Sequence, residues 1–593
     1  MNHFEIRDQF YLDGEETKIL SGAIHYFRIH PKDWYHSLYN LKATGLNAVE
    51  TYVPWNLHEP KEGTFDFKGL LDIVRFIELA ESLDLMVIVR PSPYICAELE
   101  FGGLPAWLLE KDCHIRTSDP KFIHYVDQYY ERLLKKLTPL LITNGGPIVM
   151  MQIENEYGSY GEDKDYLKAV KELMLKYKID VPLFTSDGTW EAALESGSLI
   201  KEGILPTGNF GSDGKANFKN LKYFHDKYEK DYPLMSMEFW DGWFNNWGKE
   251  IVTRNTKDLV KALRETVQDG SFNLYMFHGG TNFGFTTGTS EGDEYDLPQI
   301  TSYDYGAPLD EQGNPTKAYY EIKTMLKEEL PELEQFKPII KESMVHKEIP
   351  LAEKVSLRNV LEEVSEIEKS LYPKTSEELE HYYGYTLYRT KLDNYGGNHL
   401  LKIVDANDRC QIFVDNEHLA TQYQHEIGED IPVEDPKENS ELSILLENVG
   451  RINYGHKLLA DTQRKGIRTG VMFNHRFINH WTQYKIDFSK VKDIDFNKKW
   501  EEGKPSFYKY NFKLEEKEDT YIDLSQFGKG IVLVNGFNIG RYWDIGPTLS
   551  LYVPKHLLNE GKNSIVIFET EGKYSETLDL LDQAKFKEME KEA

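Results

Sequence analysis

The chain has 593 residues, of which 40% are hydrophobic and 28% are charged, the proportions of an ordinary folded protein. This length exceeds what one hydrophobic core supports, so two or three domains are expected. The formal net charge of −29 disfavours binding to nucleic acid or to an anionic membrane and is compatible with a neutral substrate.

Up to about residue 320, short apolar runs typical of buried strands alternate with amphipathic stretches such as 70–83 and 165–178, which predict helices. Eight such alternations favour a closed parallel (β/α)8 barrel of the TIM type over an open sheet. We assign this catalytic barrel to residues 1–324. The predicted strands are 18–27, 47–55, 85–94, 147–156, 181–187, 204–210, 233–239 and 272–280.

Two glutamates close two of these apolar runs. Glu156 ends the fourth predicted strand in VMMQIENEYG, and Glu238 ends the seventh in PLMSMEFWDGW. A buried carboxylate is costly unless it is paired or functional, and catalytic residues of such barrels lie at the C-terminal ends of the strands. We therefore expect both carboxylates at one mouth of the barrel. They fit a retaining glycosidase, in which the two carboxyl groups lie roughly 5–5.5 Å apart, with Glu156 as acid/base and Glu238 as nucleophile.

A third glutamate, Glu154, lies two residues before Glu156 and on the same face of the predicted strand, so spacing alone does not choose between them. The alternative to catalysis is a buried carboxylate that tyrosine, histidine or backbone donors satisfy. We keep that structural interpretation for Glu154. The amide of Asn155 favours Glu156 as the acid, because it can hold a ring hydroxyl beside the reacting carbon.

Residues 325–380 are rich in charge and predict a solvated connector with some helix. After residue 380 the helical period nearly disappears, and three pairs of segments repeat with offsets of 122, 120 and 122 residues. A near-constant offset predicts two similar all-β sandwiches with jelly-roll-like topology, at 381–494 and 495–593. The paired segments are 385–392 with 507–514, 412–416 with 532–536, and 441–447 with 563–569.

The chain resembles glycoside hydrolase family 35, the β-galactosidases, over nearly its full length. The resemblance implies that it cleaves terminal, non-reducing β-linked galactose from oligosaccharides, with retention of configuration and without a cofactor. The motifs that carry it are TYVPWNLHEP (51–60), RPSPYICAELEFGGLPAWLL (90–109), QIENEYGSY (152–160), EFWDGWFNNWG (238–248), NLYMFHGGTNFG (273–284), TSYDYGAPLDEQG (301–313), ENVGRINYG (447–455) and VNGFNIGRYW (534–543).

The resemblance also implies a set of substrate contacts and supports the roles of the two glutamates. Trp240 and Trp243, on a loop after the nucleophile with Trp247, either stack on the sugar beyond galactose or pack within the loop. Ser92 and Leu99 depart from the family, which usually has glycine and often tryptophan at these places. The residues that match the family's galactose contacts are Tyr52, Cys96, Ala97, Glu98, Asn155, Tyr275 and Tyr303.

Two other functions stay open from the sequence. A β-glucosidase would use the same pair of glutamates with different surrounding contacts. A sugar-binding protein with a decayed active site would lack one of the glutamates, and both are present. The sandwiches are expected to brace the barrel and shape its entrance, and Arg451 and Tyr454 of the first sandwich are candidates to reach the mouth.

No H-E-x-x-H or comparable ligand spacing occurs, so no metal is expected. Cys96, Cys113 and Cys410 are odd in number and widely spaced, which predicts no disulfide framework. The start of the sequence has no secretory pattern and no apolar segment approaches the roughly 20 residues of a membrane span, so a cytoplasmic protein is expected, with surface association not excluded. The flat sandwich surfaces are compatible with a homodimer.

Overall fold

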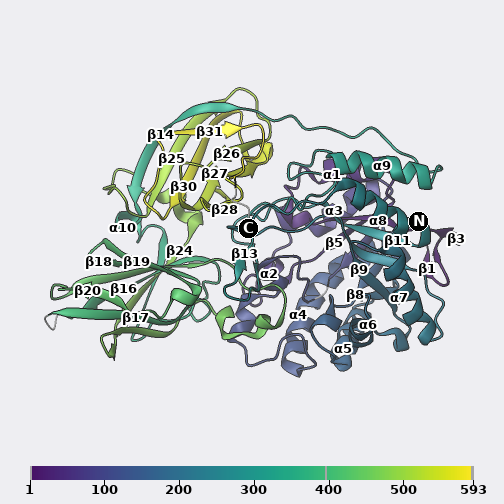
Figure 1. Cartoon of the computed structure of the whole chain (residues 1–593), viewed down its shortest axis with the longest axis horizontal. Coiled ribbons are helices and arrows are strands. Elements are labelled where there is room, and N and C mark those ends of the chain that lie inside the picture. Colours follow the sequence, from purple (N-terminus) through teal and green to yellow (C-terminus); the bar gives the residue numbers. More distant parts are fainter. Residues whose placement is uncertain (1–2, 92, 394–396, 589–593) are drawn as a thin grey trace.

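The computed structural model of the chain describes residues 3–91, 93–393 and 397–588. An α/β barrel forms one side of the molecule, and two all-β regions lie on the other side (Figure 1). Within the described part of the chain, no helix combines the length and the apolar character that a membrane span requires.

The barrel is closed by eight parallel strands, each of which lies within or overlaps a run predicted from the sequence. Nearly every residue of these strands is buried, because helices cover the outside and side chains fill the inside. This double burial explains why the strands are continuous apolar runs. The strands are β4 (Leu20–Ile24), β5 (Ala48–Tyr52), β6 (Met86–Arg90), β7 (Ile148–Gln152), β8 (Leu183–Gly188), β9 (Leu205–Phe210), β10 (Met235–Trp240) and β11 (Ser271–His278).

Helices follow the strands around the barrel, and several begin at a side chain that caps them. Asp72 accepts from the backbone of α3, Asp119 from that of α4, and Asp163 from that of α5. The stretches 70–83 and 165–178 are therefore helical as predicted, with ends that differ by one to three residues. The helices are α1 (Trp34–Ala43), α2 (Trp55–His58), α3 (Ile73–Ser82), α4 (Pro120–Leu137), α5 (Lys164–Lys176), α6 (Glu191–Gly197), α7 (Gly214–Lys227), α8 (Thr256–Asp269) and α9 (Lys317–Glu329).

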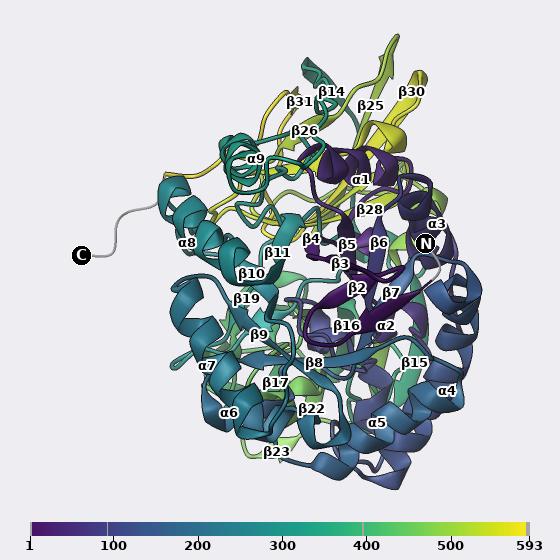
Figure 2. The same cartoon turned by 90° about the vertical axis from the view of Figure 1, so that its right-hand side faces the viewer.

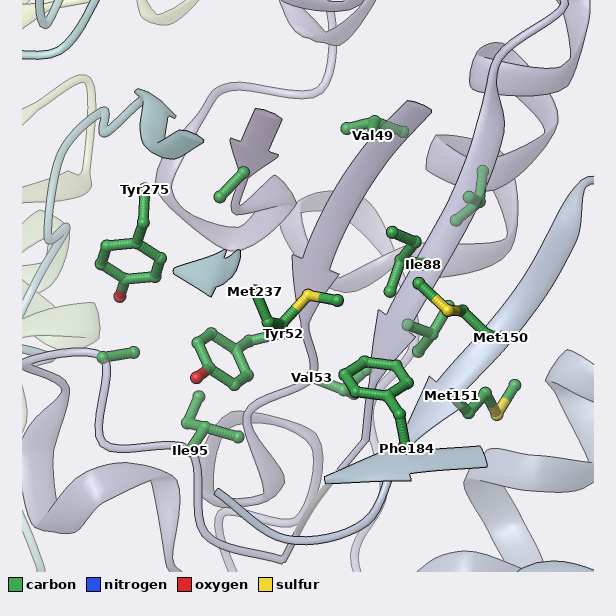
Figure 3. Packing of buried hydrophobic residues seen from close by; sticks show 14 of the residues in the cluster. Val49, Tyr52, Val53, Ile88, Ile95, Met150, Met151, Phe184, Met237 and Tyr275 are labelled. Carbon is green, nitrogen blue, oxygen red and sulfur yellow. The ribbon is translucent and has the colours of Figure 1, made fainter. Parts of the chain in front are cut away.

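Large apolar side chains from neighbouring strands fill the barrel, so it is a packed core rather than a pore. Ile88, Met150 and Phe184 come from three successive strands, and the rings of Tyr52 and Tyr275 lie further along the core (Figure 3). The hydroxyls of the two tyrosines point toward the same end of the barrel, near Ile95 (Figure 3). That end is the C-terminal mouth.

A small antiparallel sheet precedes the barrel, and the sequence analysis did not predict it. Its strands are β1 (Phe4–Ile6), β2 (Phe10–Leu12) and β3 (Glu15–Thr17). Phe4 stacks on Phe10, with ring centroids 5.9 Å apart, and both belong to the barrel core. The sheet lies on the side of the barrel away from the all-β regions (Figures 1 and 2).

The two all-β regions share one strand arrangement, which confirms the internal repeat. In the first region the neighbouring strands run β16-β21-β18-β19, and in the second they run β25-β30-β27-β28. Corresponding strands begin 120–122 residues apart, as the repeat predicted. Their bounds are β16 (Gly384–Leu392), β18 (Arg409–Val414), β19 (Glu417–Tyr423) and β21 (Ser440–Asn448), then β25 (Ser506–Leu514), β27 (Lys529–Val534), β28 (Phe537–Trp543) and β30 (Gly561–Glu569).

The other strands of the two all-β regions complete their sheets. The first region has a six-stranded and a four-stranded sheet with an apolar core between them, and the second has one eight-stranded sheet around its own core. These other strands are β14 (His346–Ser356), β15 (Ser365–Ser370), β17 (Asn398–Asn407), β20 (Ile431–Glu434), β22 (Gly466–Phe473), β23 (Arg476–Phe477), β24 (Trp481–Ile486), β26 (Thr520–Asp523), β29 (Ser550–Val553) and β31 (Thr577–Leu581).

The segment 325–380, for which we expected a solvated connector, contributes a strand to each all-β region. β14 pairs with β25 and β31 of the second region, and β15 pairs with β24 of the first. The charged side chains misled the prediction, because they occupy the exposed faces of these strands. Ile349 of β14 is buried in the core of the second region and Val355 in the apolar cluster between the two regions, while Lys347 and Glu348 are exposed.

The two all-β regions also pack on each other. Tyr385 of the first and Phe568 of the second meet with ring centroids 5.2 Å apart in a shared apolar cluster. Arg541 joins all three parts of the molecule, since it donates to Thr287 Oγ1 of the barrel at 2.8 Å and to the Asn448 carbonyl of the first region at 2.7 Å. We expected a homodimer to be possible because the two all-β regions offer flat surfaces. Part of these surfaces is therefore buried in contacts within the chain.

Candidate active site

A cavity of about 520 Å³ opens at the C-terminal mouth of the barrel, and both Glu156 and Glu238 line it. Glu238 lies on β10, and Glu156 lies on the loop that follows β7. Asn453 and Tyr454 of the first all-β region form part of its wall. The volume falls in the range of small-molecule sites.

Glu238 is held by three donors. Its Oε1 accepts from the Tyr52 hydroxyl at 2.7 Å and from Arg90 Nη2 at 2.7 Å, and its Oε2 accepts from Trp240 Nε1 at 3.0 Å. All three groups donate, so they suit an ionised carboxylate, which only accepts. These contacts also fix the direction in which the carboxylate points.

Arg90 is the main site residue that the sequence analysis missed. It ends β6, is fully buried, and donates to Asn155 Oδ1 at 2.8 Å as well as to Glu238. Its guanidinium lies 3.9 Å from the centre of the Tyr52 ring. The signal was available, because a charge that closes an apolar strand is the pattern that drew attention to Glu156.

Glu156 lies in a different environment. The backbone there is left-handed, with a φ of 46°, and the side chain is half-buried at the cavity wall. Asn209 at the end of β9 donates to Glu156 Oε1 at 2.9 Å. Burial and the nearby charge of Glu238 raise the pKa of Glu156 to about 7. Glu156 is therefore suited to carry a proton near neutral pH.

Glu154 has the structural environment that we expected for it. Arg116 binds it with two hydrogen bonds of 2.9 Å, and the hydroxyl of Tyr166 donates to it at 2.9 Å. The side chain is fully buried and is not part of the cavity lining. The ion pair with Arg116 distinguishes Glu154 from Glu156, whereas the spacing in the sequence did not separate the two.

The expected galactose contacts divide into a lining set and a supporting set. Cys96, Ala97, Glu98, Asn155 and Tyr275 line the cavity, and all five are buried. Tyr52 and Tyr303 lie behind the lining, Tyr52 against Glu238 and Tyr303 as the donor to Glu98.

The 96–98 segment has an unusual backbone. Cys96, Ala97 and Glu98 all have positive φ, between 49° and 57°, although none is glycine. Arg28 donates to the Ala97 carbonyl, and the Gly288 amide donates to the Glu98 carbonyl at 3.0 Å. Strained backbone of this kind persists where surrounding contacts hold it, and it is common at functional sites.

The two departures from the family pattern lie beside this segment. Leu99 is fully buried, and its backbone bridges to Thr287. Ser92 lies outside the described residues.

Burial raises the pKa of Glu98 to about 7, even though Tyr303 donates to it.

Aromatic side chains form the outer wall. Trp240 and Trp243 line the cavity and meet edge to face, with ring centroids 5.7 Å apart. Trp247 is buried elsewhere, against Trp543 of the second all-β region, so it packs against another part of the molecule and does not line the cavity. Trp190, which the sequence analysis did not single out, also lines the cavity.

The loop of the first all-β region that carries Asn453 and Tyr454 is fastened to the barrel. Tyr94 donates to the Asn453 carbonyl at 2.6 Å. Arg451 lies behind this loop, fully buried, and pairs with Glu100 of the barrel and Glu377. Of the two candidates named for the mouth, Tyr454 lines the cavity and Arg451 anchors the loop.

The remaining lining residues come from loops and strand ends that the sequence gave no reason to bring together. The cavity residues not anticipated are Ile95, Ser159, Gly188, Trp190, Phe244, Ser290, Glu291, Gly292, Asp293, Tyr305, Asn453 and Gly455.

Within the described ranges, no group of three or more histidine, cysteine, aspartate or glutamate side chains could hold a metal ion.

Comparison with known families and proteins gives consistent matches along the chain. The model of glycosyl hydrolases family 35 matches residues 9–329, that of the beta-galactosidase first all-beta domain matches 373–487, and that of the beta-galactosidase galactose-binding domain matches 505–563. The chain is 34% identical to beta-galactosidase 17 of Arabidopsis thaliana, over 98% of this chain and 89% of the relative. It is 37% identical to beta-galactosidase of Mus musculus, over 95% of this chain and 91% of the relative.

Proposed function

Because the chain belongs to glycosyl hydrolases family 35, and is therefore a glycosidase, we propose that it is a retaining exo-β-galactosidase. Its substrate would be an oligosaccharide that ends in a non-reducing β-D-galactosyl residue. The named relatives at 34–37% identity support galactose as the sugar. No cofactor enters the proposed mechanism.

The observation that carries the proposal is the unequal environment of two carboxylates on one cavity. Glu238 accepts from three donors, as a nucleophilic carboxylate requires, whereas Glu156 has a pKa raised to about 7 and can still carry a proton near neutral pH. Pairs of carboxyl groups whose environments separate their protonation states are the signature of acid and nucleophile in glycosidases.

In the proposed reaction Glu238 attacks the anomeric carbon of galactose while Glu156 gives its proton to the departing glycosidic oxygen. The bond to the leaving sugar breaks, and galactose is left as an ester on Glu238. Glu156, now ionised, takes a proton from water, whose oxygen displaces Glu238 and releases galactose in its original β configuration. Arg90 and Tyr52 hold Glu238 in line for both steps.

The shape of the cavity supports removal of a terminal sugar. The end formed by Glu98, Asn155 and Tyr275 is buried and polar, which suits the hydroxyls of one ring. The opposite end is open, since Trp243 and Tyr454 are 38% and 43% exposed. The galactose would occupy the closed end, and the leaving sugar would contact the aromatic wall.

Proton NMR of the anomeric region during hydrolysis of an aryl β-D-galactoside tests this proposal. We expect β-galactose first, with α-galactose growing later by mutarotation. Initial α-galactose would refute the nucleophile role of Glu238. If the protein instead cleaves an aryl β-D-glucoside in preference to the galactoside, it is a β-glucosidase.

A further inference from the structure

A second hollow adjoins the cavity, on the far side of its aromatic wall. This groove has a volume of about 430 Å³ and shares Trp190, Trp240 and Trp243 with the cavity. The two spaces therefore meet across these three indole rings. The other residues that line the groove are Thr189, Asn209, Phe210, Gly211, Ser212, Asn217, Gly242 and Arg254.

The groove begins on the side of the cavity where the leaving group departs. Asn209 lines the groove and donates directly to Glu156 Oε1. Since Glu156 is the proposed proton donor, the glycosidic oxygen must lie beside it when the bond breaks. A sugar chain attached to that oxygen therefore leaves the cavity next to Asn209.

Trp190 is placed to receive such a chain. It follows the end of β8, and its side chain is 55% exposed although it is a large aromatic group. The ring lies close over Gly188, where a Cβ atom would come within 1.8 Å of it. The backbone carbonyl of Trp190 accepts from the Ala193 and Leu194 amides at the start of α6, which fixes the position of the residue.

The chemistry of the groove suits an uncharged sugar. An exposed indole face stacks on the apolar face of a pyranose, and Thr189, Ser212 and Asn217 supply polar groups beside it. Its described lining contains no carboxylate, and the guanidinium of Arg254 is committed to the carbonyls of Trp240 and Gly211. The other rim of the cavity carries Glu291 and Asp293.

We propose that this groove is a binding subsite for the second sugar beyond the cleaved galactose, with Trp190 as its stacking platform. The preferred substrates are then neutral oligosaccharides of at least three units. The inference rests on the proposed function and extends it, because the cavity alone accounts for galactose and one further sugar.

The test compares kcat/KM for two substrates. One is a neutral trisaccharide with a terminal β-galactosyl residue, and the other is the disaccharide made of the first two sugars of that trisaccharide, counted from the non-reducing end. For the wild type we expect the trisaccharide to be favoured by about tenfold, the factor that one aromatic contact can supply. Trp190→Ala should bring this ratio close to one, and Trp190→Phe should keep an intermediate ratio. Tyr223→Ala is the matched control, since Tyr223 is 62% exposed on α7 and lines neither hollow.

The outcomes separate the inference from the function beneath it. If the wild type cleaves both galactosides with equal kcat/KM, or if Trp190→Ala keeps the wild-type ratio, the groove is not a sugar subsite and the proposed function stands. If the wild type cleaves no β-galactoside, the proposed function is refuted, and the inference with it.

Discussion

Replacement of Asn209 by alanine should move the alkaline limb of the pH profile upward. The proposed acid, Glu156, must be protonated, and its pKa of about 7 means that kcat/KM falls about tenfold for each pH unit above that value. Asn209 stabilises the ionised form, because its amide donates to Glu156 Oε1 at 2.9 Å. Ser186 donates to Asn209 Oδ1 at 2.5 Å and so turns the amide nitrogen toward Glu156.

The size of the shift follows from the strength of that bond. A hydrogen bond to a charged group contributes about 1.5–3 kcal/mol, and one pKa unit corresponds to about 1.4 kcal/mol, so loss of the bond in a dry site would raise the pKa by about one to two units. Water in the open cavity replaces part of the lost bond, so we expect the limb to move up by about one pH unit.

The assay is kcat/KM for an aryl β-D-galactoside between pH 5 and 10, which reports the free enzyme. Asn217→Ala is the control, because Asn217 lines the same groove but donates to the Ser212 carbonyl, away from Glu156. A limb that stays in place or moves down in Asn209→Ala would refute the assignment of Glu156 as the group behind it.

Substitutions at three further positions test other parts of the protein. Tyr52→Phe removes one donor to Glu238 and should lower kcat/KM roughly 10- to 100-fold, measured by steady-state kinetics, with an unchanged unfolding temperature. Arg116→Met leaves Glu154 buried without its ion pair and should lower the free energy of unfolding by about 3–5 kcal/mol, measured by denaturant unfolding, whereas a loss restricted to activity would contradict the structural role. Arg451→Met should loosen the loop of the first all-β region and raise KM more than it lowers kcat, and Arg451→Lys should restore part of the loss.

The barrel and the two glutamates of the proposed mechanism were predictable because each leaves a local signal. Parallel strands covered on both faces are continuous apolar runs. Glu238 near the end of β10 and Glu156 in the loop just after β7 place a charge where such a run ends. Arg90 leaves the same signal at the end of β6, and its importance depends on contacts with the loop after β7 and with β10. The strand β14 was missed because its exposed face carries the charges that suggested a solvated connector.

Other parts of the site leave no local signal. Asn209 and Trp190 come from consecutive strand ends and meet Glu156 and Glu238 only through closure of the barrel. Tyr454 lies almost 300 residues after Glu156 in the chain, and a pattern within one segment does not show that the two line one cavity. Full-length resemblance to a family could mark these residues for attention, but it could not assign their contacts.

The position of the first all-β region follows from the cost of burying charge. Arg451 is completely buried with Glu100 and Glu377, and such a group is stable only when the partners keep close geometry, because the loss of hydration must be offset by the ion pairs. Glu100 belongs to the barrel, so the contact holds the first all-β region in one register against it. Tyr454, three residues after Arg451, is thereby fixed at the cavity wall. The all-β region is thus an integral part of the site, and the open end of the cavity takes its shape from both.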